Sequence, residues 1–75
     1  MAVLVILNAS GDARVEFDPE VADERLDRAR RTFEARVGKG WLAYVPGEGG
    51  RGGTQIRRFD PKAREILLQP AIAGG

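Results

Sequence analysis

Two apolar runs at opposite ends of the chain place the tightest limit on the fold. Residues 2–7 are continuously apolar, and residues 66–68 form a second apolar run. Short runs of this kind are typical of strands that are buried on both faces. A chain of 75 residues can build only one small core, so both runs have to share it. We therefore predict that the first and last strands lie side by side at the centre of one sheet.

One segment between these runs carries a helical pattern. Asp18 is typical of an N-cap and Pro19 of a first helical position, and Gly38 is typical of a C-cap. The apolar residues in between are three or four positions apart, which lays them along one stripe. They are Ala22, Leu26, Ala29, Phe33 and Val37. We predict one helix that covers one face of the sheet, with Phe33 buried between the two layers.

Three further segments have strand character. Residues 14–17 alternate between polar and apolar, and they follow the first run after a turn-rich segment, which predicts a hairpin with its second strand near an edge. Residues 41–45 and 54–59 are also rich in β-favouring residues, with Ile56 pointing inward. The five glycines within residues 46–53 predict an irregular, mobile loop.

The predicted order is strand, strand, helix, strand, strand, strand. This order indicates an α+β domain with a mixed sheet of about four to five strands and one helix across one face. We place the domain at residues 1–70 and a flexible tail at residues 71–75.

Composition narrows the function classes. The chain contains neither cysteine nor histidine, which excludes disulfides, thiol catalysis and the usual zinc ligands. The 12 basic and 11 acidic residues give a net charge of +1, so we expect no nucleic-acid partner. The carboxylate pairs lie on the predicted helix or in turns, beside arginine, and do not assemble into a catalytic group with a nucleophile and a histidine, so we expect neither an enzyme nor a bound cofactor. The apolar N-terminal run is too short for a membrane span or signal peptide, so we expect a cytoplasmic protein without membrane contacts.

Other conspicuous residues have structural interpretations. We interpret Arg28, Arg30, Arg31 and Arg36 as a solvated helix face. We expect the single tryptophan, Trp41, to belong to the core.

The C-terminal residues carry a more specific signal. Pro70 removes a backbone donor and so ends the last strand. A short apolar segment, residues 71–73, then leads to Gly74 and Gly75. Because glycine has no Cβ, a Gly-Gly terminus can pass through a narrow channel and leave its acyl carbon open to a nucleophile.

This C-terminal arrangement resembles the ubiquitin-like β-grasp proteins. The spacing from the Ile66-Leu67-Leu68 run through Pro70 to Gly-Gly is most similar to the bacterial sulfur carriers, namely the small subunit of molybdopterin synthase and the thiazole-biosynthesis carrier. The resemblance implies a β-grasp fold over essentially the whole chain. It also implies that the domain acts as a carrier and is monomeric when free.

The resemblance supports two carrier functions. In the first, a ubiquitin-like protein modifier, a partner activating enzyme uses ATP to adenylate the Gly75 carboxylate. The acyl group then passes to a cysteine thioester and to target amines, with a conjugating enzyme and an isopeptidase as further partners. In the second, a sulfur carrier, the terminus becomes a thiocarboxylate for cofactor biosynthesis or tRNA thiolation. We favour the modifier, because the centre of the chain departs from the sulfur-carrier pattern: residues 60–65 replace the Asp-Gly-Asp-like turn of the sulfur carriers, and the glycine-rich segment 46–53 has no counterpart in them. A third possibility is a β-grasp interaction domain that is not conjugated.

The expected functional residues follow from this resemblance and from strand alternation. Gly74 and Gly75 form the acyl-carrier terminus. If Ile66 and Leu68 face the helix, Leu67 and alternate members of the first strand face the other side of the sheet. We expect a partner-binding surface there, because exposed aliphatic side chains on one face require a cover. Its predicted residues are Leu67, Pro70, Ala71, Ile72 and Ala73.

Overall fold

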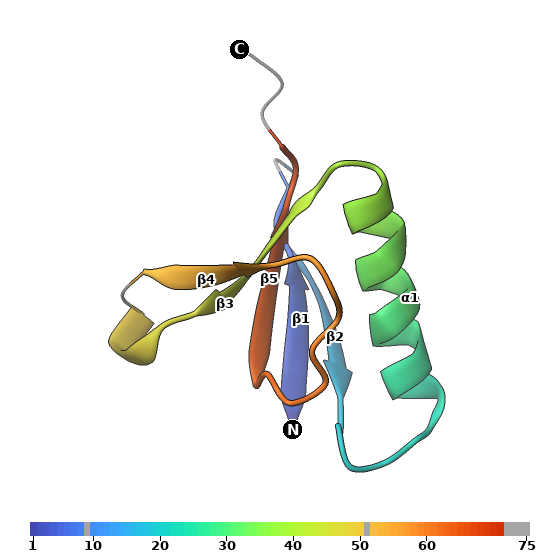
Figure 1. Ribbon diagram of the computed structural model, residues 1–75. Coiled ribbons are helices and arrows are strands. Elements are labelled where there is room, and N and C mark those ends of the chain that lie inside the picture. Colours follow the sequence, from blue (N-terminus) through green and yellow to red (C-terminus); the bar gives the residue numbers. More distant parts are fainter. Residues whose placement is uncertain (9, 51, 72–75) are drawn as a thin grey trace.

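The computed structural model describes residues 1–8, 10–50 and 52–71, which form one α-helix packed on a mixed sheet of five strands (Figure 1). The strands are β1 (Ala2–Ile6), β2 (Ala13–Phe17), β3 (Leu42–Pro46), β4 (Gly53–Ile56) and β5 (Glu65–Gln69), and the helix is α1 (Glu24–Gly38). A 3₁₀ turn, Glu48–Gly50, lies between β3 and β4. The predicted α+β class is confirmed.

The strand order in the sheet is β2-β1-β5-β3-β4. Strands β1 and β5 are parallel neighbours at the centre, and the other neighbouring pairs are antiparallel. The predicted pairing of the two most apolar runs is therefore confirmed, as are the hairpin of β1 with β2 and the edge position of β2. A central strand has a neighbouring strand on each side, which shields its side chains from solvent. The continuously apolar segments therefore occupy the central positions.

The core lies between α1 and one face of the sheet. Leu4 is in register with Ile66, and Ile6 with Leu68, and all four side chains are buried. Phe33 of α1 packs onto this layer with an exposed fraction of 1%, as predicted. No polar or charged residue within the described part of the chain is buried.

An aromatic cluster extends this core toward the connection between β4 and β5. The ring of Phe59 lies 5.5 Å from that of Phe17 and 5.7 Å from that of Phe33, measured between ring centroids. The expectation that the fourth strand continues to residue 59 is wrong, since β4 ends at Ile56. Packing of Phe59 under the helix explains this difference, because it draws the chain out of the plane of the sheet.

The helix begins later than the sequence pattern predicts. Its first residue is Glu24 and its N-cap is Asp23, whose Oδ1 accepts hydrogen bonds from the amides of Arg25 (2.9 Å) and Leu26 (3.3 Å). Ala22, predicted to belong to the buried stripe, is exposed. Asp23 satisfies two of the free amides of the first turn, so it is the residue that starts the helix.

Asp18 closes a separate tight turn. Its side chain accepts from the amide of Glu20 (2.9 Å), and its carbonyl accepts from the amide of Val21 (3.1 Å). Asp60 does the same with the amides of Lys62 (2.9 Å) and Ala63 (3.2 Å). The segments Phe17-Asp18-Pro19 and Phe59-Asp60-Pro61 therefore lead into the same kind of turn, and each begins with a phenylalanine of the aromatic cluster.

Two further boundaries differ from the sequence pattern. Gly38 is still helical, and the left-handed backbone after the helix is at Gly40, with φ of 96°. The glycine-rich segment is more regular than predicted, because Pro46 and Gly53 pair with each other at the ends of β3 and β4. Gly49, with φ of 65°, then turns the chain within this hairpin.

Trp41 packs half-buried against the core, and the guanidinium of Arg36 lies 4.7 Å from its ring centroid. Arg36 therefore covers an aromatic face in addition to contacting solvent.

We predict that Phe33→Ala lowers the free energy of unfolding by about 3–5 kcal/mol, because it removes a fully buried ring and its contact with Phe59. Urea denaturation measures the change. Arg28→Ala, an exposed substitution on the same helix, is the control and should stay within about 0.5 kcal/mol of the parent. A Phe33→Ala protein as stable as this control would contradict the assigned core.

Asp23 also predicts how stability depends on pH. Partial burial raises the pKa of this carboxyl, but hydrogen bonds from the amides of Leu26 and Arg25, together with the Arg25 guanidinium, have the larger combined effect. The net result is a pKa below its ordinary value of 3.8. A carboxyl whose pKa is lower in the folded state stabilises the fold above its unfolded pKa. This stabilisation is lost as the pH falls through the folded pKa.

We therefore predict that Asp23→Asn, which retains a side-chain oxygen for capping, reduces the loss of stability below the ordinary pKa of 3.8. Thermal unfolding of both proteins across the acid range measures this. Parallel curves for the two proteins throughout that range would contradict the assignment.

Candidate docking face and the start of the C-terminal tail

The side of the sheet that is turned away from α1 forms a second face, which we call the open face. Strand register assigns its members, because residues that are directly opposite on neighbouring strands share a face. Val5 is opposite Leu67 on β5, and Leu67 is opposite Tyr44 on β3. The apolar members of the open face are Val3, Val5, Leu42, Tyr44, Pro46 and Leu67, and the polar members are Arg14, Glu16, Gln55, Glu65 and Gln69.

The aliphatic residues of this face are less exposed than the alternation suggested. Val5 has an exposed fraction of only 6%, and Leu67 is half-buried. Val5 lies in register between Arg14 on β2 and Leu67 on β5, so long side chains flank it on both sides. The open face is therefore a mixed surface, and the expectation of several freely exposed aliphatic side chains is corrected.

Leu67 lines a hollow in this face with a volume of about 470 Å³. Tyr44 and Pro46 border it on β3, and Glu65 and Gln69 border it on β5. The hollow can accept an apolar side chain at Leu67 while polar groups at its edge pair with the rest of a partner segment.

Glycine helps to shape one end of the hollow. Gly52 and Gly53 line it where β4 begins, and a Cβ on Gly53 would lie 3.0 Å from the carbonyl oxygen of Val45. A side chain at position 53 would therefore require the hairpin to shift. Sequence reasoning named Leu67 but not Tyr44 or Pro46, since these become its neighbours only through the pairing of β3 with β5.

The predicted tail begins beside this face. Strand β5 ends at Gln69, and Pro70 and Ala71 are exposed immediately after it. Leu67, Pro70 and Ala71 therefore form a short path from the open face past the end of the central strand. The other predicted residues, Ile72, Ala73, Gly74 and Gly75, lie outside the described residues.

Two other features are absent from the described part of the chain. No group of three or more acidic, histidine or cysteine side chains there is arranged to hold a metal ion. No helix among the same residues is long and apolar enough to cross a membrane.

The chain was compared with protein-family models, with curated proteins and with solved structures, and none of these matches it.

Proposed function

We propose that this domain is a ubiquitin-like protein modifier with a β-grasp fold. A partner activating enzyme binds it and ATP, and the Gly75 carboxylate attacks the α-phosphate to give an acyl-adenylate and pyrophosphate. A cysteine thiolate then displaces AMP to form a thioester, and a target amine displaces the thiolate to form an amide. The chain has no cysteine, so the thiol belongs to a partner protein.

One observation carries this proposal: the central strand β5 leads directly into an exposed Pro70 and Ala71, and the sequence then continues to Gly74 and Gly75. A strand held by neighbours on both sides is a firm base for a terminus that must reach into another protein's site. The absence of side chains on the last two residues suits passage through a narrow channel. The arrangement of one helix on a mixed sheet is compatible with a β-grasp.

The open face provides a surface that a partner can bind while it receives the tail. In the proposed complex, an apolar side chain of the activating enzyme fills the hollow at Leu67. Pro70, Ala71, Ile72 and Ala73 then extend the contact toward Gly75. No residue of this segment is charged, so its recognition depends on apolar contacts and backbone hydrogen bonds.

The uncharged segment before Gly-Gly also favours a second candidate, a sulfur carrier. The same acyl-adenylate is its intermediate, but a sulfur donor displaces AMP and leaves a C-terminal thiocarboxylate. The third candidate, an interaction domain that is not conjugated, requires no activation at all.

Mass spectrometry separates these three candidates. The purified chain is incubated with the adenylating enzyme of its host, ATP and a sulfur donor, after its intact mass has shown that Gly75 is the terminal residue. A mass gain that equals the replacement of one oxygen atom by sulfur identifies a sulfur carrier. Conjugation is read from trypsin digests of host extract: Arg64 is the last basic residue, so residues 65–75 remain attached to each modified lysine. An unmodified terminus with no branched peptides would contradict both carrier functions.

We predict that deletion of Gly75 abolishes ATP-dependent adenylate formation and leaves the melting temperature unchanged, because the residue follows the end of the sheet. Pyrophosphate exchange measures activation. Gly74→Val should be nearly as damaging, since a β-branched side chain restricts the backbone and widens the tail. Normal activation of the deletion variant would refute the role of the terminus.

We predict that Leu67→Asp binds the activating enzyme at least about tenfold more weakly, or about 1.4 kcal/mol, because a carboxylate replaces the apolar floor of the hollow. Val21→Asp is the matched control, since Val21 is an exposed apolar residue away from this face. Calorimetry measures binding and circular dichroism the fold. Leu67→Gln replaces the variant if the aspartate impairs folding. Unchanged binding by a folded variant would move the docking surface elsewhere.

A further inference from the structure

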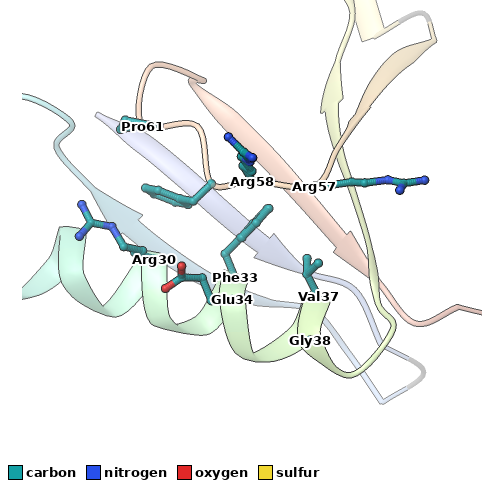
Figure 2. A pocket seen from close by; sticks show the side chains of 9 residues that line it. Arg30, Phe33, Glu34, Val37, Gly38, Arg57, Arg58 and Pro61 are labelled. Carbon is teal, nitrogen blue, oxygen red and sulfur yellow. The ribbon is translucent and has the colours of Figure 1, made fainter.

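A second hollow lies on the helix side of the sheet, between the C-terminal half of α1 and residues 57–61 (Figure 2). Its volume is about 590 Å³. Arg30 and Glu34 line it from the helix, and Arg57 and Arg58 line it from the segment after β4. We call this hollow the helix groove. It shares no lining residue with the hollow at Leu67.

The helix groove has an apolar floor. Phe33 and Phe59 meet there with their ring centroids 5.7 Å apart, and Phe59 is only half-buried. Val37, also half-buried, and the exposed Pro61 continue the apolar lining. The floor therefore offers an aromatic edge to an apolar side chain, without opening the fully buried part of the core.

The rim of the helix groove is basic. Three arginines, Arg30, Arg57 and Arg58, and one carboxylate, Glu34, give it a net charge of +2, whereas the whole chain has a net charge of +1. All four side chains are exposed. Figure 2 shows that these arginines come from two separate elements, Arg30 from the helix and Arg57 and Arg58 from the segment that follows β4, and that the side chain of Arg57 extends away from the helix.

The rim arginines are not neutralised within the described part of the chain. The ion pairs there join Arg25 to Asp23 and Arg31 to Asp27, and neither pair lies in the helix groove. Glu34, one helical turn after Arg30, forms no ion pair with it.

The helix dipole opposes this positive charge only weakly. It places roughly half a negative charge at the C-terminal end of a helix. At α1 the carbonyl of Arg36 accepts from the amides of Lys39 and Trp41, and that of Val37 accepts from Gly40. A net side-chain charge of +2 outweighs this partial charge, and the groove attracts anions.

We propose that the helix groove binds an acidic peptide segment of a partner protein. One or two apolar side chains of the peptide lie on the floor formed by Phe33 and Phe59, and its carboxylates pair with the rim arginines. A guanidinium can bind a carboxylate with two parallel hydrogen bonds, which lysine cannot do. The groove does not depend on Gly75, so this binding is independent of the proposed carrier function.

The groove favours a peptide over a nucleic acid for two reasons. Glu34 lies within it and would repel a nucleic acid, which carries a phosphate at every nucleotide, whereas a peptide can place an uncharged residue beside Glu34. Nucleic-acid binding also depends on many cationic contacts, whereas the whole chain has a net charge of only +1. A short segment with one or two apolar residues flanked by acidic residues fits both the floor and the rim.

Fluorescence polarisation with three matched labelled peptides tests the proposal. The first contains Asp-Asp-Leu-Leu-Asp-Glu between glycines, the second has Asn and Gln in place of the acids, and the third has Gly-Gly in place of the leucines. We expect saturable binding of the first that weakens as salt is added, and binding of the other two at least fivefold weaker. No saturation with the first peptide up to about 1 mM, or equal binding of the amide peptide, would overturn the proposal.

Charge reversal locates the binding site. We expect Arg30→Glu, and the double variant Arg57→Glu with Arg58→Glu, each to weaken binding of the first peptide at least fivefold. Arg28→Glu makes the same change on the same helix outside the groove and should have less than a twofold effect on binding. Glu34→Gln should strengthen binding.

Thermal unfolding confirms that each variant is folded, and Arg30→Gln is measured in place of any variant that is not folded. An equal loss with Arg28→Glu would overturn the proposal, because the effect would then come from overall charge. Tighter binding of a labelled oligothymidine, lost in the same groove variants, would overturn it in favour of a nucleic acid.

Discussion

The parallel pairing of β1 with β5 is the constraint on which the rest of the structure depends. Parallel neighbours cannot be joined by a tight turn, so the chain between them must leave the sheet and return. Here that crossover contains the edge strand β2, helix α1 and the hairpin of β3 with β4 (Figure 1). Each of these elements packs against or pairs with the central strands. The pairing of the first and last strands therefore also stabilises the elements that lie between them in the sequence.

The aromatic contact at Phe59 is the second constraint. It anchors the connection between β4 and β5 under the helix through the rings of Phe17 and Phe33. Because Phe59 is drawn inward, Arg57 and Arg58 stand beside the C-terminal half of α1. The same packing that closes the core thus creates the helix groove and gives it a basic rim. A loss of this aromatic contact would affect both stability and the shape of the groove.

The sequence predicts the parts of this fold that depend on local composition. Strand alternation predicted that Ile66 and Leu68 share the face opposite to that of Leu67, and the apolar runs predicted the central strands, because burial on both faces requires apolar side chains throughout. The start of the helix was missed for a physical reason: Asp18 and Asp23 both satisfy the local rule for an N-cap, and only the turn that Asp18 closes with Glu20 and Val21 decides between them.

Long-range pairing explains what the sequence could not predict about the two surfaces. Tyr44 and Leu67 are 23 positions apart and become neighbours through the register of β3 with β5. Arg30 and Arg58 are 28 positions apart and line one groove only because Phe59 packs beneath the helix. The interpretation of Arg30 as part of a solvated helix face agrees with its exposed side chain, but its neighbours on the rim are invisible to a local pattern. A charge cluster assembled from distant segments appears only when the core that joins them is known.

The positions of the two surfaces have a consequence for how partners can combine. The hollow at Leu67 faces away from the helix, and the helix groove lies on the helix side, so the sheet and its core separate them. A partner seated at Leu67 and the tail therefore leaves the helix groove free. The chemistry of the two surfaces also differs: the tail segment is uncharged and the groove rim carries a net charge of +2. Added salt should weaken binding at the groove and leave the apolar contacts at Leu67 largely intact. The proposed acidic partner and the proposed activating enzyme can thus be distinguished by the salt dependence of their binding, even if both bind the same domain.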